Sequence, residues 1–465
     1  MVSIPSRFQG IEIPADNPFK NDKLGYSKYE SVFKGMVDMY KDTGCVIALN
    51  GKWGSGKTTY IKMWQASLQN QGYNTIYFNA WETDYLQDPL IAILGELKGI
   101  SKDNSKFQSV FSRLGSIAVS GGWAIIKGLL KKSTGVEADA VSEAIDQTKR
   151  ILLNDLEEYA KQKSSLEEFK KALEEYVADQ YENPVVFIVD ELDRCNPHYA
   201  VRTLEIMKHL FDVPNICFVL TIDKSQLECS IKGFYGSGEI DANNYLRRFI
   251  DIEYRMPEPS LDGFTELLYE HYGFQAFFDT ISEDHFHTPD DFRDMSTALC
   301  KLFRLDLRTY DKIMAHTRLV FIQQKMESIL VDVVLLLNFL RIALPDFFDA
   351  ISRHDFSVNG LLEEFEKRFP QDLLVENDGN YSRGRLAHKM IYLIGPFLRL
   401  YNVQEGSELE PGYSGSGMNE TFPLTCHIID QEALFGALRW FNRRTNLNYG
   451  LDNVIKTVNL FREFS

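Results

Sequence analysis

The first half of the chain alternates short apolar runs with longer segments of helical spacing. The runs are rich in β-branched and aromatic residues, which is typical of strands buried inside a sheet. Because helical segments separate them, the strands are predicted to lie parallel to one another. The five predicted strands are the run that begins at Cys45, then Asn74–Asn79, Val185–Val189, Ile216–Asp223 and Phe249–Tyr254.

Two long segments depart from this alternation. Residues 86–182 contain no further strand signal and their last part has helical spacing, so we expect a helical insertion at about 90–182. From Leu261 onward, apolar residues recur at helical spacing and no alternation of period two returns. The sequence therefore predicts an α/β domain over residues 1–260 and a C-terminal all-helical domain over residues 261–465.

The first predicted strand runs into a glycine-rich turn, CVIALNGKWGSGKTT. The spacing G-x-x-x-x-G-K-T, from Gly51 to Thr58, is that of a phosphate-binding loop. Glycines let consecutive N–H groups turn toward the phosphates. Lys57 supplies a charge to the β and γ oxygens, Thr58 offers a hydroxyl to Mg²⁺, and the helix that starts here turns its positive end toward the anion. The predicted nucleotide-binding residues are Gly51, Gly54, Ser55, Gly56, Lys57, Thr58 and Thr59.

A pair of carboxylates follows the third predicted strand. NPVVFIVDELDRC delivers Asp190 and Glu191 at the carboxyl end of an unbroken apolar run, and ligands of open α/β sheets bind at that edge. A carboxylate at the tip of the strand beside the phosphate loop can hold magnesium, usually through water, and we assign this role to Asp190. Glu191 is placed to orient and deprotonate the attacking water. Asp193 is the nearest alternative base.

The last two predicted strands add further candidates. The fourth strand ends in Thr221 and Asp223, which could reach the γ-phosphate or the lytic water. Arg247 and Arg248 stand just before the fifth strand, and arginine suits the stabilisation of charge on a transferring phosphoryl group. A solvated arginine pair at a helix end is the equally open alternative.

Composition limits the classes of partner and the cellular compartment that we expect for this protein. The formal net charge of -16 argues against a surface built generally for nucleic acid, although a local basic groove stays open. The six cysteines have no spacing typical of a zinc site or a disulfide framework, so we expect reduced thiols and a cytoplasmic protein. The first residues show no signal-peptide pattern.

Two apolar stretches come near the length of a membrane span. Leu114–Leu130 includes Lys127 and several Gly and Ser residues, and it is shorter than the roughly 20 apolar residues that a spanning helix needs. Val331–Phe348 carries Asp332 and Arg341, which favours a buried helix of the helical domain. No transmembrane segment is predicted.

Taken together, the phosphate loop, the carboxylates after the third predicted strand and the segments around them resemble the KAP family of P-loop NTPases. The resemblance is carried by DNPFKNDKLGYSKYE, VIALNGKWGSGKTT, IYFNAWETD, VVFIVDELDRCNPHYAVRTLEIMKHLF, FVLTIDKSQL and YLRRFIDIEYRMP, spread over residues 16–257. It implies ATP and Mg²⁺ as cofactors, with Lys57 and Thr58 binding phosphate and metal. It also implies Asp190 as a metal ligand and Glu191 as the activating carboxylate. LDLRTYDKI resembles the family's helical-domain arginine element, which nominates Arg308 as a sensor of the γ-phosphate.

The resemblance also suggests a biological setting. Many family members carry transmembrane helices between the two nucleotide motifs, where this chain has Leu114–Leu130. Bacterial relatives are associated with exclusion of phage, often alongside a separate effector enzyme. We therefore expect a homo-oligomeric regulatory ATPase that controls a protein partner in a defence complex. A nucleic-acid remodeller or motor is the alternative, disfavoured by the net charge, and a membrane-associated scaffold is the third hypothesis.

Overall fold

The computed structural model describes the chain in two compact units. The N-terminal unit comprises Glu12–Asn21 and Tyr26–Pro257, and the C-terminal unit comprises Met1–Ile11, Asp22–Gly25 and Glu258–Ser465. Within these units the described residues are 10–86, 89–99, 167–208, 213–236, 238–281, 288–323, 329–371, 374, 381–402, 409, 412–414, 419–444 and 451–459.

The N-terminal unit is built on a five-stranded parallel sheet, which confirms the predicted fold class. Its strands are β1 (Cys45–Asn50), β2 (Asn74–Asn79), β3 (Val185–Asp190), β4 (Ile216–Ile222) and β5 (Ile252–Arg255). Their order is β2-β3-β4-β1-β5, and all four pairings are parallel. One detail of the prediction was wrong: β4 lies between β1 and β3, so Asp190 is two strands away from the phosphate loop rather than on the adjacent strand.

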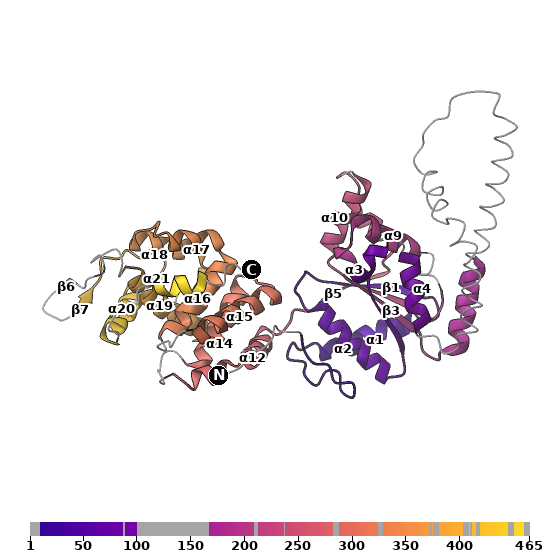
Figure 1. Cartoon of the computed structure of the whole chain (residues 1–465), viewed down its shortest axis with the longest axis horizontal. Coiled ribbons are helices and arrows are strands. Elements are labelled where there is room, and N and C mark those ends of the chain that lie inside the picture. The colour runs from indigo at the N-terminus through magenta and orange to yellow at the C-terminus, as the bar shows by residue number, and fades with distance from the viewer. Residues whose placement is uncertain are drawn as a thin grey trace, which may run out of the picture. The chain divides into compact units, whose positions relative to one another are not determined.

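Helices cover both faces of this sheet (Figure 1). On one side lie α1 (Glu30–Met39) and α2 (Lys57–Asn70), and on the other lie α4 (Pro89–Gly99) and α9 (Pro197–Lys208). The remaining elements of this unit are η1 (Ser27–Tyr29), α3 (Ala80–Thr83), η2 (Asp84–Leu86), η3 (Leu192–Arg194), α10 (Lys224–Tyr235), α11 (Ala242–Leu246) and a helix at residues 167–180.

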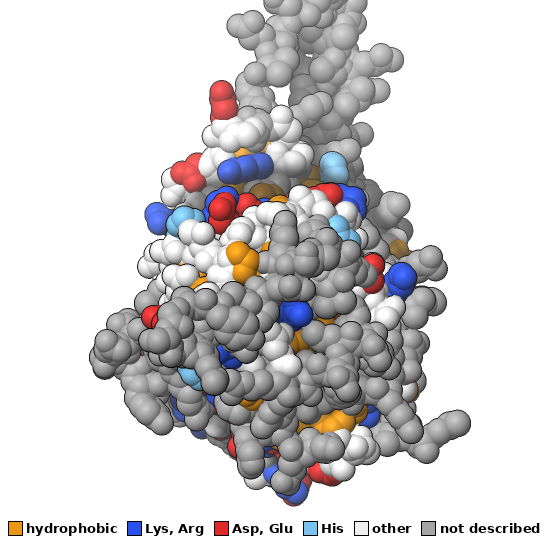
Figure 2. All heavy atoms as spheres, turned by 90° about the vertical axis from the view of Figure 1, so that its left-hand side faces the viewer, with side chains coloured by type: hydrophobic (Ala, Val, Ile, Leu, Met, Phe, Trp, Pro, Cys, Tyr) orange, Lys and Arg blue, Asp and Glu red, His pale blue; other side chains and the backbone are white. Residues whose placement is uncertain are grey.

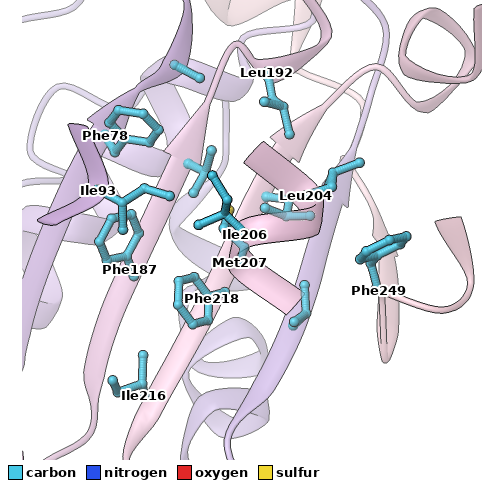
Figure 3. Close-up of a cluster of buried hydrophobic side chains, with 14 of the residues drawn as sticks. Phe78, Ile93, Phe187, Leu192, Leu204, Ile206, Met207, Ile216, Phe218 and Phe249 are labelled. Carbon is cyan, nitrogen blue, oxygen red and sulfur yellow. The ribbon is translucent and has the colours of Figure 1, made fainter. Parts of the chain in front are cut away.

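The alternation of side chains along the strands divides the apolar core between these two faces. The ring centroid of Phe187, on β3, lies 6.2 Å from that of Phe78 on β2 and 5.3 Å from that of Phe218 on β4. These rings belong to one buried cluster with Ile93 of α4 and Met207 of α9 (Figure 3). On the opposite face, Phe33 of α1 contacts Trp64 of α2 at 4.8 Å between centroids. Because both faces are buried, the strands are continuously apolar, as the sequence pattern indicated.

The C-terminal unit is helical, with one small pair of strands that the hydropathy pattern did not predict. Strands β6 (Gly412–Ser414) and β7 (Asn419–Thr421) are antiparallel. The stretch Val331–Phe348 divides into two buried helices because Pro345 starts a new one. The helices are α12 (Leu261–His271), α13 (Phe274–Phe278), α14 (Pro289–Leu302), α15 (Leu307–Gln323), α16 (Ile329–Ala343), α17 (Pro345–Ser352), α18 (Val358–Arg368), α19 (Tyr381–Asn402), α20 (Gln431–Arg444) and α21 (Leu451–Asn459).

Among the helices of the described ranges, none combines the length and the apolar character required to cross a bilayer. The stretch Leu114–Leu130 and most of the predicted insertion at 90–182 lie outside the described residues.

One half-buried histidine is expected to make the stability of the C-terminal unit sensitive to acid. The Nδ1 atom of His316, on α15, contacts the guanidinium of Arg341 on α16. Burial, and then the positive charge of Arg341, lower the pKa of His316 from its usual 6.5 to about 4. The folded protein therefore binds this proton only near pH 4, whereas the unfolded chain binds it near pH 6.5. The stability that comes from a neutral His316 is fully present above pH 6.5 and is lost as the pH falls toward 4.

We therefore expect the free energy of unfolding to fall by about 1 kcal/mol between pH 7 and pH 5, after allowance for the partial exposure of His316. The measurement is urea denaturation of the full chain at both pH values, for the parent and for His316→Gln. The glutamine stays neutral, so this variant should lose that part of the pH dependence. An unchanged pH dependence in the variant would assign the acid sensitivity to other groups.

Candidate nucleotide-binding site

The loop between β1 and α2 has the backbone of a phosphate cradle. Gly54 and Gly56 take left-handed conformations, with φ of 75° and 85°, which residues with a Cβ rarely adopt. Gly51 is required for a different reason: a Cβ there would lie 2.8 Å from the Cβ of Met256, after β5. Gly56 also stands at the start of α2, so the helix N-terminus faces the loop. The glycine positions that the motif predicts are thus sterically determined.

Lys57, the first residue of α2, folds back over this loop. Its Nζ atom donates to the carbonyl oxygens of Gly51 at 2.6 Å and Lys52 at 3.1 Å. The side chain is 8% exposed, and burial lowers the pKa of Lys57. Asp193, Asp223 and Asp190 act against this shift. The ammonium therefore sits in a partly desolvated position where a polyphosphate can replace the two carbonyl oxygens as its partner.

Asp190 is the most extensively bonded carboxylate of the site. It ends β3, is 1% exposed, and its Oδ2 atom accepts from Thr58 Oγ1 at 2.9 Å and from Tyr77 OH at 2.8 Å. Its Oδ1 atom accepts from Thr221 Oγ1 at 2.5 Å and from the Glu191 N–H at 2.9 Å. Four donors stabilise the carboxylate and fix its direction. The structure thus brings the two predicted metal ligands, Asp190 and Thr58, into direct contact.

Thr221 and Tyr77 act on this site through Asp190. Thr221 lies in β4 opposite Asp190 in the strand register, and it is fully buried. Tyr77 comes from β2, on the other side of β3. Burial and then the nearby charge of Asp190 raise the pKa of Tyr77, which keeps its hydroxyl a donor. Sequence reasoning missed Tyr77 because an aromatic residue in a strand is ordinarily a packing residue.

Glu191 occupies a strained position directly after the strand. Its φ of 60° is left-handed, which is uncommon for a residue with a side chain and often marks a functional site. Its Oε1 atom lies 3.0 Å from Nη1 of Arg194, at the end of η3. The guanidinium of Arg194 in turn lies 5.9 Å from the ring centroid of Trp53 and 5.7 Å from that of Trp81. Neither tryptophan nor Arg194 was predicted as a site residue.

Asp193 and Asp223 fix the phosphate loop to the neighbouring strand ends. Asp193 Oδ2 accepts from Trp53 Nε1 at 2.5 Å and from the Asp223 N–H at 3.0 Å. Asp223 Oδ2 accepts from the Trp53 N–H at 3.2 Å, and Oδ1 accepts from the Ser225 N–H at 3.2 Å at the start of α10. Burial raises the pKa of Asp193, although these donors and Lys57 oppose the shift. Asp193 therefore serves as an anchor for the loop in this arrangement.

The loop also holds a buried polar atom that a phosphate would satisfy. The hydroxyl oxygen of Ser55 is buried and has no hydrogen-bond partner among the described residues. The backbone around it is fixed, because Tyr26 OH donates to the Ser55 carbonyl oxygen at 2.9 Å. A buried hydroxyl without a partner costs free energy, so this site fits an added acceptor such as a phosphate oxygen. Thr59, the last predicted loop residue, lies half-buried in the first turn of α2.

The predicted arginines occupy different units. Arg247 and Arg248 are exposed at the end of α11, ahead of the edge strand β5. The hydrogen bond from Lys224 is the main cause that lowers the pKa of Glu253 on β5, and Arg247 adds a smaller contribution. Arg308 belongs to the C-terminal unit, in the first turn of α15, where its N–H donates to Asp306 Oδ1 at 3.0 Å. Asp306 thus caps the first turn of that helix.

Comparisons with known proteins match the chain to one protein family and to solved structures of low sequence identity. The ORC2 protein of Aeropyrum pernix, in ADPNP–ADP complexes, has 12% identity and a TM-score of 0.33, with 89% of this chain and 94% of that chain covered. Cdc6p from Pyrobaculum aerophilum has 11% identity and a TM-score of 0.37, with 98% and 99% covered. No curated protein matches the sequence significantly. The KAP family P-loop domain matches residues 26–340, and the chain therefore belongs to the KAP family of P-loop NTPases.

Proposed function

We propose that the protein is a Mg²⁺-dependent ATPase whose nucleotide state switches an assembly between conformations. The observation that carries this proposal is the 2.9 Å hydrogen bond between Thr58 and Asp190. These two side chains come from α2 and β3, far apart in the sequence, and each is of the type that binds magnesium beside a phosphate loop. Their contact beside Lys57 supports a site for a metal-bound triphosphate.

The roles of the individual residues follow from this geometry. The loop N–H groups, Lys57 and Ser55 would bind phosphate oxygens, and Thr58 and Asp190 would hold Mg²⁺. When bound, the metal neutralises charge on the phosphates. Glu191 would accept a proton from water as the water oxygen forms a bond to the γ-phosphorus and the bond from that phosphorus to the bridging oxygen of ADP breaks. The products are ADP and inorganic phosphate.

Removal of the Lys57 side-chain charge provides the direct test of the phosphate loop. We expect Lys57→Ala to abolish tight nucleotide binding, with affinity weakened at least about tenfold, because a charged hydrogen bond to phosphate is lost. The measurement is titration with fluorescent analogues of ATP and of GTP, each with and without Mg²⁺. Lys34→Ala, on α1, is a matched control that removes a lysine from the same unit. Equal affinity in the Lys57→Ala variant and the parent would contradict the phosphate-loop assignment.

The assembly that we propose is a homo-oligomer that controls an effector enzyme in an antiphage defence complex. The defence setting rests on the family resemblance alone. Purification from the native host, followed by identification of the bound proteins, tests for the partner. Plating of phage on hosts that carry the parent or the Lys57→Ala variant tests for the role. Equal plating efficiency on both hosts would remove nucleotide-dependent defence from the proposal.

Surface charge supports a protein partner over nucleic acid. The chain has a formal net charge of -16, which repels phosphate backbones. On the face that Figure 2 shows, the coloured Lys and Arg side chains lie among coloured Asp and Glu side chains. A nucleic-acid remodeller would instead be expected to carry a continuous basic stripe.

A further inference from the structure

We propose that Arg194 is a positioning residue that restrains Glu191, and that the indole rings of Trp53 and Trp81 hold Arg194 in its restraining place. The restraint sets a low basal rate of hydrolysis and links that rate to the state of the phosphate loop. This inference rests on the proposed ATPase function and concerns the regulation of the same site.

The first step is the ion pair itself. Glu191 Oε1 lies 3.0 Å from Arg194 Nη1, and the two side chains are only 16% and 22% exposed. A largely buried pair is screened less than a surface pair, so it holds its geometry more firmly. The Oε1 atom of Glu191 therefore has the guanidinium of Arg194 as a partner. In this arrangement Glu191 is not set to act as the general base.

The second step is the pair of aromatic rings beside Arg194. The guanidinium lies within 6 Å of the ring centroids of both Trp53 and Trp81, which is the range of cation–π attraction. Trp53 and Trp81 are 42% and 50% exposed, so these large rings contribute little to the apolar core. Contact with Arg194 is the interaction that both rings share. They therefore fix the guanidinium from the phosphate loop and from α3.

The third step links the restraint to the nucleotide. Trp53 is part of the phosphate loop, between Gly51 and Gly54, and its indole and backbone N–H groups are bonded to Asp193 and Asp223. A change in the loop on binding a triphosphate would therefore move a ring that contacts Arg194. Movement of that ring weakens the hold on Arg194 and frees the Glu191 oxygen for water. Binding of a nucleotide to the phosphate loop and the ability of Glu191 to act as the base are thus coupled through Trp53.

The test is the steady-state rate of ATP hydrolysis by the full chain with Mg²⁺. Arg194→Ala should raise kcat about two- to fivefold, the factor that an ion pair of modest strength carries, while affinity for a fluorescent ATP analogue changes less than about twofold. Arg194→Lys keeps the charge but loses the planar stacking, and its kcat should fall between those of the parent and Arg194→Ala. Trp81→Ala should also raise kcat, without any change in the loop or in Glu191.

Two controls separate restraint from general damage. Arg293→Ala, on α14, removes an arginine that likewise has carboxylate partners and lies 4.7 Å from a tyrosine ring centroid, and it should leave kcat unchanged. Arg194→Ala in a Glu191→Gln background should be no faster than Glu191→Gln alone. A structural role alone would lower kcat or thermal stability and would not raise kcat.

The outcomes distinguish this inference from the proposed function. If the parent hydrolyses ATP and neither Arg194→Ala nor Trp81→Ala is faster, the restraint is refuted and the ATPase function stands. If Arg194→Ala does not fold, Trp81→Ala alone decides. If neither the parent nor either variant hydrolyses ATP, the function and the restraint are both refuted. If the parent shows no measurable hydrolysis and Arg194→Ala hydrolyses ATP, both the ATPase function and the restraint by Arg194 are supported.

Discussion

Replacement of Glu191 by glutamine is expected to lower ATP turnover by at least about a hundredfold while ATP·Mg²⁺ binding persists. The amide keeps the shape of the side chain but cannot take a proton from water, and general-base catalysis contributes about 10² to 10⁴ in rate. Binding should persist because the groups assigned to phosphate and metal are Lys57, Thr58 and Asp190. Single-turnover hydrolysis and titration with an ATP analogue measure the two effects separately.

Asp193 is the internal control for this assignment. Its Oδ2 atom accepts from Trp53 and from the Asp223 N–H, so its carboxylate acts as an anchor of the loop. Asp193→Asn preserves an acceptor for those donors, and its loss of turnover should be much smaller than that of Glu191→Gln. If Glu191→Gln hydrolyses ATP at the parental rate and Asp193→Asn does not, Asp193 is the base.

The fold was largely predictable because a parallel sheet buried on both faces leaves a simple sequence signal. Each strand is a short apolar run, and the predicted starts of β2, β3 and β4 agree with the structure. β5 begins at Ile252 rather than Phe249, since Phe249 belongs to the turn after α11 and packs on Tyr245. Aromatic residues in that turn resemble a strand in sequence, and only tertiary contacts separate the two cases.

The phosphate loop was predictable because its spacing is local, whereas the surroundings of Asp190 depend on strand order. No local pattern says that β4 lies between β1 and β3, and this order is what brings Thr221 onto Asp190. Strand register likewise places the buried thiols of Cys45 and Cys217 3.0 Å apart, although they are 172 positions apart in the sequence. Contacts that depend on which strands pair are not visible in a single sequence.

The contacts of Trp53 and Arg194 were missed for another reason. In sequence, a tryptophan inside a glycine-rich loop and an arginine after an acidic pair each suggest an ordinary surface residue. Their role appears only when η3 brings Arg194 back toward the loop, with its guanidinium 5.9 Å from the Trp53 ring centroid. Glu191 has a left-handed φ, and the short turn η3 that follows it carries Arg194 toward the phosphate loop.

A second large effect is expected from the arginine pair ahead of β5. Arg247→Ala combined with Arg248→Ala should lower turnover by about 10³ to 10⁵, the contribution of an arginine finger supplied by a neighbouring subunit. Both side chains are exposed, and β5 is an edge strand, while the opposite edge is β2. If the β5 edge of one copy contacts a different surface of the next copy, repetition of that contact builds a ring or a filament. Specific activity should then rise with protein concentration, and Lys232→Ala, an exposed cation on α10, should behave as the parent.

Mixing of two inactive proteins tests whether the arginines act across subunits. Glu191→Gln retains both arginines but lacks the base, and the double arginine variant retains the base but lacks the finger. In a mixed assembly, a subunit with an intact Glu191 can receive Arg247 and Arg248 from its Glu191→Gln neighbour, so part of the activity should return. No recovery, together with specific activity that is independent of concentration, would make both arginines local structural residues and the enzyme a self-sufficient monomer. Recovery would require at least one active site to be completed by a neighbouring subunit, because neither protein alone contains both groups.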